Sequence, residues 1–90
     1  MLKHYKIKVL GRVQGVWFRK YAQEEARRSG ITGLIRNEND GSVYIEAEGD
    51  EQRLNTFIKW CHEGSPLSEV REVKWEEDLP SQYTEFEIIR

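Results

Sequence analysis

Apolar and polar residues follow two different spacings along this chain of 90 residues. They alternate from His4 to Gly11, which predicts a strand, because every second side chain of a strand faces the same side of a sheet. From about Trp17 to Ser29 the apolar residues recur three and four positions apart, which predicts a helix. Gly30 stands where a helix commonly ends in a left-handed conformation. A second strand is predicted from Ile31 to Asn37.

The middle of the chain predicts a hairpin and a second helix. The dipeptide Asp40-Gly41 is a strong hairpin signal, and apolar residues alternate with polar ones from Val43 to Glu48. This stretch is therefore the predicted antiparallel partner of the second strand. Asp50 is placed to cap the second helix, which Gly64 ends. The apolar stripe of that helix consists of Leu54, Phe57, Ile58 and Cys61.

The last third of the chain predicts two more strands and completes the fold. Val73 and Trp75 share one face of a fourth strand, and Val70 is out of phase with them, which indicates a bulge or a later start of the strand. A short last strand runs from Glu85 to Arg90. One hairpin and two helices predict the α+β class. The expected architecture is a ferredoxin-like βαββαβ sandwich, with both helices on one face of an antiparallel sheet and a short C-terminal strand.

Composition and charge make residues 1–90 a single domain with no general basic surface. The net charge of −2 at pH 7 argues against nucleic-acid binding, but it allows one small positive pocket. No apolar run reaches the roughly 18 residues of a membrane helix. Cys61 is the only cysteine, so no intrachain disulfide forms. With an N-terminus that lacks a signal-peptide core, this predicts a cytoplasmic location.

The candidate chemistry is concentrated between Gly11 and Arg19, where the first strand leads into the first helix. A glycine-bearing loop can turn its backbone N–H groups into one concavity, and the helix start adds unpaired N–H groups and a partial positive charge. Such a place attracts phosphate. Arg19 lies in the first helical turn, and its guanidinium matches two phosphate oxygens. A short glycine loop alone is weak evidence, so an ordinary strand-to-helix connection stays open from this segment by itself.

Two longer segments carry a family resemblance. The first acylphosphatase signature is closely similar to the residues GRVQGVWFR at 11–19, and the second is similar to GLIRNENDGSV at 33–43. The resemblance continues at 49–51 and at 64–67, and it covers nearly the whole chain. It implies the ferredoxin-like fold and an acylphosphatase activity, which is hydrolysis of the carboxyl–phosphate bond of acyl phosphates to a carboxylate and inorganic phosphate.

The resemblance also implies a role for each matching residue. The phosphoryl group of the substrate is bound by the backbone N–H groups of Gln14, Gly15, Val16, Trp17, Phe18 and Arg19. The Arg19 side chain binds it as well, and Asn37 positions the attacking water. The implied enzyme uses no cofactor and no metal, because a carboxylate departs without being protonated. The expected partner is a small-molecule acyl phosphate, with no nucleic acid and no membrane, and the expected state is a monomer.

The chain departs from the family pattern at Trp17, where many members carry glycine. Tryptophan narrows the allowed backbone angles and places a large ring near the rim of the pocket. With an ordinary negative φ at this position, the predicted cradle of N–H groups persists. The ring is then a candidate to stack on the acyl part of a substrate.

Two other functions remain open from the residues alone. A module that binds phosphate without turnover would share the loop, and only Asn37 argues for catalysis. An RNA-binding sheet of the same topology would need a basic surface and several exposed aromatic residues on its central strands, and the net charge has the wrong sign. His4 and His62 lack metal-ligand spacing, so both are expected at the surface or at a sheet edge.

Overall fold

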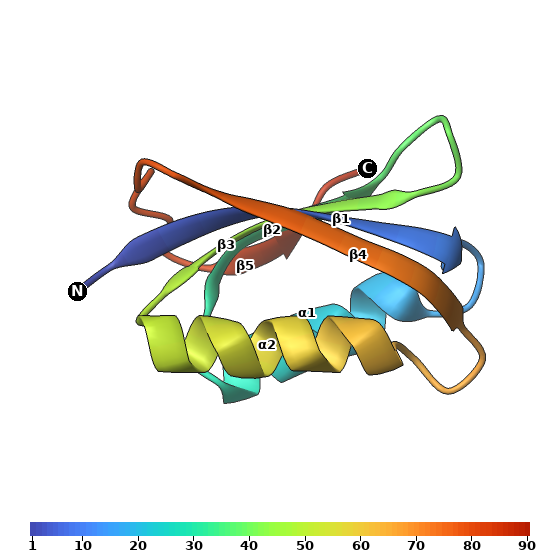
Figure 1. Cartoon of the computed structure of the whole chain (residues 1–90), viewed down its shortest axis with the longest axis horizontal. Coiled ribbons are helices and arrows are strands. Elements are labelled where there is room, and N and C mark those ends of the chain that lie inside the picture. Colours follow the sequence, from blue (N-terminus) through green and yellow to red (C-terminus); the bar gives the residue numbers. More distant parts are fainter.

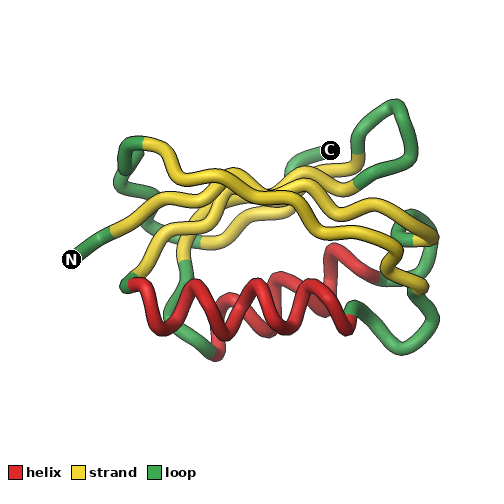
Figure 2. Tube along the Cα trace, in the orientation of Figure 1, coloured by secondary structure: helices red, strands yellow, loops and turns green.

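The alternating segments of the sequence form the five strands of one sheet, and both helical segments lie on the same face of it (Figure 1). The structure is a computed structural model that describes residues 1–90. In chain order the elements are β1 (Lys3–Arg12), α1 (Phe18–Arg28), β2 (Thr32–Asn37), β3 (Val43–Gly49), α2 (Glu51–Glu63), β4 (Glu69–Asp78) and β5 (Phe86–Ile88). Figure 2 shows the strands and the helices as two separate layers. The predicted ferredoxin-like α+β fold is confirmed, and neither helix is long and apolar enough to span a bilayer.

The pairing of the strands determines which loops meet. The order across the sheet is β4-β1-β3-β2-β5, and β3 is antiparallel to both β1 and β2. β1 and β2 therefore run in the same direction, and their carboxyl ends lie at the same edge of the sheet. The loop after β1 and the last residue of β2, Asn37, meet there. β5 is shorter than the predicted strand and pairs in parallel with β2, with Ile88 opposite Ile35.

The phase change at Val70 is a β-bulge, one of the two predicted alternatives. Leu10 of β1 is opposite Glu72 of β4, whereas Gly11 is opposite Val70, so Arg71 is the extra residue. The extra residue returns Val70 to the face that the core occupies. Glycine is needed at position 11, since a Cβ there would lie 2.2 Å from the carbonyl oxygen of residue 69.

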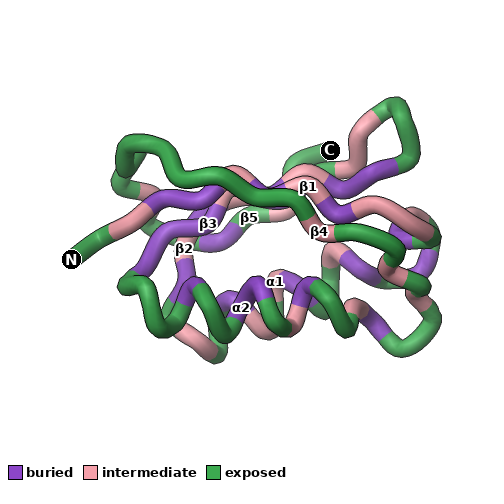
Figure 3. Tube along the Cα trace, in the orientation of Figure 1, coloured by how far each residue is buried: buried purple, intermediate pink, exposed green.

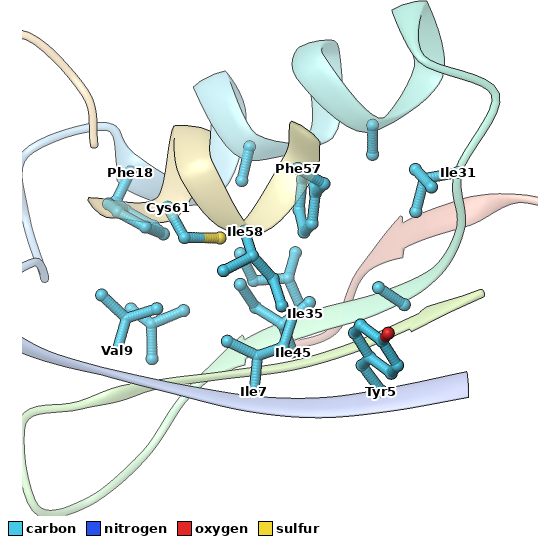
Figure 4. Packing of buried hydrophobic residues seen from close by; sticks show 14 of the residues in the cluster. Tyr5, Ile7, Val9, Phe18, Ile31, Ile35, Ile45, Phe57, Ile58 and Cys61 are labelled. Atoms are coloured by element: carbon cyan, nitrogen blue, oxygen red, sulfur yellow. The ribbon is translucent and has the colours of Figure 1, made fainter. Parts of the chain in front are cut away.

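The hydrophobic core fills the space between the helices and the facing side of the sheet (Figures 3 and 4). Ile7, Ile35 and Ile45 project toward the helices from three different strands, and each is fully buried. Phe18, the first residue of α1, is also buried and packs on Trp60 of α2, with the ring centroids 5.2 Å apart. This contact fixes where α1 begins, and with it the loop that precedes α1.

The expectation of a surface or edge histidine is wrong for His4, which is buried. Its Nδ1 lies 2.8 Å from Glu48 Oε2, and its Nε2 lies 2.9 Å from Glu46 Oε1. Both contacts are hydrogen bonds at the same time only when both ring nitrogens carry a proton. The segment between β4 and β5 covers this group, because the backbone N–H groups of residues 81–83 donate to Glu48 and the Tyr83 ring stacks on His4. No local pattern in the sequence signals that a distant segment folds over this strand.

Glu48 is the buried acceptor at the centre of this contact. Burial raises the pKa of its carboxyl group, but the hydrogen bonds from His4 and from three backbone N–H groups lower that pKa by more, so it lies below its ordinary value. A carboxyl group whose pKa is lowered by folding stabilises the native state above the unfolded pKa, about 4.3. That stabilisation is lost as the pH falls through the lower, folded pKa.

We therefore expect Glu48→Gln to lower the free energy of unfolding at pH 7 by about 2 kcal/mol, because the amide weakens charge-assisted hydrogen bonds. The variant should also lose less stability than the parent between pH 5 and pH 3. Urea denaturation followed at several pH values measures both effects. Glu87→Gln, at an exposed position of β5, is the matched control and should change neither. Equal stability of the Glu48 and Glu87 variants at pH 7 would contradict this role.

Candidate active site

A pocket of about 390 Å³ lies at the sheet edge where the carboxyl ends of β1 and β2 meet. It is lined by Val13, Gly15, Trp17, Phe18, Arg19, Lys20, Asn37, Ile88 and Arg90. Five residues predicted for the site are among them, namely Gly15, Trp17, Phe18, Arg19 and Asn37. The topology thus brings together the two sequence segments to which the family resemblance assigns a common site.

Gln14 and Val16 do not line the pocket. Both hold the loop in place through hydrogen bonds to other segments of the chain. The Gln14 side chain donates through Nε2 to the carbonyl oxygens of Glu38, at 2.8 Å, and Ser42, at 2.9 Å. The carbonyl oxygen of Val16 accepts a buried hydrogen bond of 2.7 Å from Ser65 Oγ. These contacts tie the loop to the β2–β3 hairpin and to the segment between α2 and β4. A role of the Gln14 and Val16 N–H groups in binding phosphate stays a prediction.

Sequence reasoning missed Ser65 as a supporting residue. It is buried and holds the loop from a position 49 residues further along the chain. The only available signal was that it falls in the last matching segment, 64–67, to which no contact was assigned.

The first turn of α1 lines the pocket, and no side chain caps its N–H groups. Trp17 precedes the helix, its side chain makes no capping hydrogen bond, and no acidic residue occupies the first turn. Phe18, Arg19 and Lys20, which form that turn, all line the pocket. The free N–H groups and the positive end of the helix dipole therefore favour an anion at this place. Arg19 adds a permanent positive charge and five N–H donors.

Asn37 contributes an acceptor that the protein itself does not satisfy. Its Oδ1 is buried and has no hydrogen-bond partner. An unsatisfied buried polar atom costs about 1–3 kcal/mol, so native proteins keep few of them. Asn37 lines the pocket together with Arg19. Since Oδ1 itself has almost no accessible surface, the side-chain amide must rotate toward the pocket to accept a hydrogen bond from a molecule bound beside the guanidinium.

Sequence reasoning also missed three lining residues, Lys20, Ile88 and Arg90. Ile88 and Arg90 reach the pocket because β5 pairs in parallel with β2, and no signal in the sequence specifies that pairing. For Lys20 the sequence held one signal, namely that it directly follows Arg19, a residue predicted for the site. Nowhere in the chain do three or more His, Cys, Asp or Glu side chains lie in position to hold a metal ion.

The ordinary negative φ named above as a condition for the cradle is not found at Trp17. The backbone there has φ 64° and ψ 17°, the left-handed conformation that glycine adopts without strain. For an L residue this conformation costs about 1–2 kcal/mol. The chain nevertheless turns here into α1 and keeps the flanking residues around the pocket. The indole is 69% exposed, so its packing does little to offset the strain.

We expect Trp17→Gly to raise the free energy of unfolding by about 0.5–1 kcal/mol, because relief of the left-handed strain exceeds the extra entropy of glycine in the unfolded chain. Trp17→Ala removes the same ring but keeps a Cβ, so it should give no such gain. Thermal unfolding of both variants measures the difference, which corresponds to roughly 2–8 °C in Tm for a domain of this size. A glycine variant no more stable than the alanine variant would show that this backbone conformation carries no strain.

The sequence and the fold of this chain resemble those of known proteins. The family model described as acylphosphatase matches residues 5–88. The chain is 52% identical over 73 residues to the acylphosphatase of Bacillus licheniformis, covering 81% of each chain, and 43% identical over 88 residues to that of Shewanella amazonensis, covering 97% of each. The crystal structure of acylphosphatase from Bacillus subtilis is similar with a TM-score of 0.95 at 40% identity, over 100% of both chains. Fold, site segments and relatives agree, and the chain belongs to the acylphosphatase family.

Proposed function

We propose that this protein is an acylphosphatase that acts on small acyl phosphates. An acyl phosphate and water give a carboxylate and inorganic phosphate, with the bond between the phosphorus and the acyl oxygen broken. The observation that carries the proposal is one pocket that holds Arg19, the free N–H groups of the first α1 turn, and the unsatisfied Oδ1 of Asn37. Arg19 and the N–H groups form a site for an anion, and Asn37 supplies an acceptor for a water molecule beside that anion.

The phosphoryl group is held by the backbone N–H groups of residues 14–19 and by the guanidinium of Arg19. In phosphoryl transfer, negative charge spreads over the equatorial oxygens, and catalysis consists mainly of positioning and of stabilising that charge. One unit charge about 4 Å from another contributes roughly 4 kcal/mol at an effective dielectric constant of 20. Arg19 can present two parallel N–H donors to two of these oxygens, which fixes the orientation of the group as well.

Asn37 positions the water. A water O–H donates to Oδ1 of Asn37, which leaves a lone pair of the water directed at phosphorus, opposite the acyl oxygen. No histidine or carboxylate side chain lines the pocket. The water proton therefore passes to a phosphoryl oxygen of the substrate, and the acyl oxygen leaves as a carboxylate, which needs no general acid. The products are the carboxylate and dihydrogen phosphate, so atoms and charge balance.

Phosphate release from acetyl phosphate and benzoyl phosphate, measured in the presence of EDTA, tests the proposal. Hydrolysis should be much faster than the spontaneous reaction, and p-nitrophenyl phosphate, a monoester with a poorer leaving group, should be hydrolysed far more slowly. Tight binding of inorganic phosphate without turnover of either acyl phosphate would instead identify a phosphate-binding module. The unsatisfied Oδ1 of Asn37 favours the enzyme, because a binder has no need to position a water. A monomeric state and a cytoplasmic location stay predictions.

A further inference from the structure

The pocket carries more positive charge than one phosphoryl group needs. Arg19, Lys20 and Arg90 all line it, and no acidic residue does. None of the three takes part in the ion pairs of the protein. Lys6 and Lys8 on the sheet are paired, with Asp78 at 2.9 Å and with Asp40 at 2.8 Å. Arg71 and Lys74 on β4 are unpaired too, but they lie outside the pocket. In a chain of net charge −2, three unpaired cations at one pocket indicate an anionic ligand with more than one charged group.

Arg90 is brought to the pocket by specific backbone contacts. The N–H of Ile89 donates to the carbonyl oxygen of Ile35 at 2.8 Å, which extends the parallel pairing of β5 with β2 by one residue. If this register continues, Arg90 lies opposite Asn37, the last residue of β2. Gln23 of α1 also donates to the carbonyl oxygen of Phe86 at 2.9 Å. The chain end is thereby held between β2 and α1.

Lys20 reaches the same pocket from another element. It lies in the first turn of α1, next to Arg19, and it is exposed. Its ammonium and the Arg90 guanidinium therefore come from α1 and from the chain end after β5. The pocket volume of about 390 Å³ falls in the range of pockets that enclose ligands of drug size, about 300–1,000 Å³. Space and charge both remain once Arg19 and the N–H groups hold a phosphoryl group.

We propose that Lys20 and Arg90 form a subsite for a second anionic group, so that the preferred substrates are acyl phosphates whose acyl chain ends in a carboxylate. This inference rests on the proposed hydrolysis of acyl phosphates. The phosphoryl group occupies Arg19 and the first α1 turn, and the distal carboxylate pairs with Lys20 and Arg90. A guanidinium can bind a carboxylate through two parallel hydrogen bonds, and an ammonium adds a point charge.

Succinyl phosphate and butyryl phosphate test the subsite, because they share a four-carbon acyl chain and differ at its far end by a carboxylate in place of a methyl group. We expect the unmodified protein to show a kcat/KM roughly tenfold higher for succinyl phosphate, the combined effect of two exposed charge pairs at low ionic strength. The double variant Lys20→Gln/Arg90→Gln should bring this ratio close to one. The double variant Lys59→Gln/Lys74→Gln removes the same charge at exposed positions outside the pocket and should keep the ratio.

Each alternative gives a different result. If the cations only attract any acyl phosphate to the protein, the pocket variant slows both substrates by the same factor, and the subsite is overturned. A ratio near one in the unmodified protein overturns it as well. If neither substrate releases phosphate, the proposed function itself fails, and the failure is visible with butyryl phosphate, which does not need the subsite. Thermal unfolding of the variants verifies that each one is folded.

Discussion

Arg19→Ala is expected to lower kcat/KM for acetyl phosphate by about 10³–10⁵-fold while the protein remains folded. An arginine that stabilises a transferring phosphoryl group contributes this much in rate, because the charge on the phosphoryl oxygens grows toward the transition state. Arg19 lines the pocket, and its side chain makes no hydrogen bond or ion pair within the protein. The substitution therefore removes no contact that stabilises the fold. Steady-state phosphate release and far-UV circular dichroism measure the two parts of the expectation.

Arg19→Lys separates charge from geometry. Lysine keeps the positive charge but cannot present two parallel N–H donors. We expect it to recover only a small part of the activity lost in the alanine variant. Arg27→Ala, at an exposed position in the last turn of the same helix, is the matched control and should keep the unmodified rate. Activity of Arg19→Ala within tenfold of the unmodified protein would remove this residue from the mechanism.

Asn37→Ala is expected to lower kcat by about 10²–10³-fold with a much smaller change in KM, because positioning the water matters in the transition state more than in binding the phosphate. The same substitution should not lower the free energy of unfolding. Oδ1 of Asn37 is buried without a partner, so the alanine variant loses no native hydrogen bond and removes an unsatisfied acceptor. A structural asparagine would show the opposite result, with lower stability and little change in kcat.

Two further variants complete the test of Asn37. Asn55→Ala, at an exposed position of α2, is the control for loss of an asparagine side chain. It should leave kcat unchanged and raise stability slightly, by about 0.5 kcal/mol, because alanine favours the helix. Asn37→Asp keeps an acceptor at the same place but adds a negative charge beside the phosphoryl group, so it should also be slow. Activity of Asn37→Asp should improve as the pH is lowered and the carboxyl group is protonated. Activity that is independent of the charge at position 37 would argue against direct contact with the reacting molecule.

Local spacing along the chain was enough to identify most of the fold. Alternation and helical spacing are consequences of which side chains face the core, so the strands and helices follow from the sequence directly. The bulge opposite Leu10 was visible for the same reason, as one residue out of phase. Arg19 could be predicted to line the pocket because it follows the glycine-bearing loop directly in the sequence.

Contacts between distant segments were not accessible in this way. The parallel addition of β5 places Arg90 beside Asn37, and the segment between β4 and β5 buries His4. Ser65 supports the loop from beyond α2. The left-handed backbone at Trp17 runs against the preference of its own residue type, because the loop before it is anchored and Phe18 after it is fixed in the core. Such a conformation is imposed by the surroundings and has no local signal.

The sequence by itself thus determined the class of fold and the positions of the proposed phosphate-binding loop and its arginine, since each depends on residues close together along the chain. Only the tertiary structure decided the shape and charge of the whole pocket. It placed Asn37 in the same pocket as Arg19, added two cations from α1 and the end of the sheet after β5, and held the loop with Gln14. These features depend on strand order and register, which arise from packing the entire core at once.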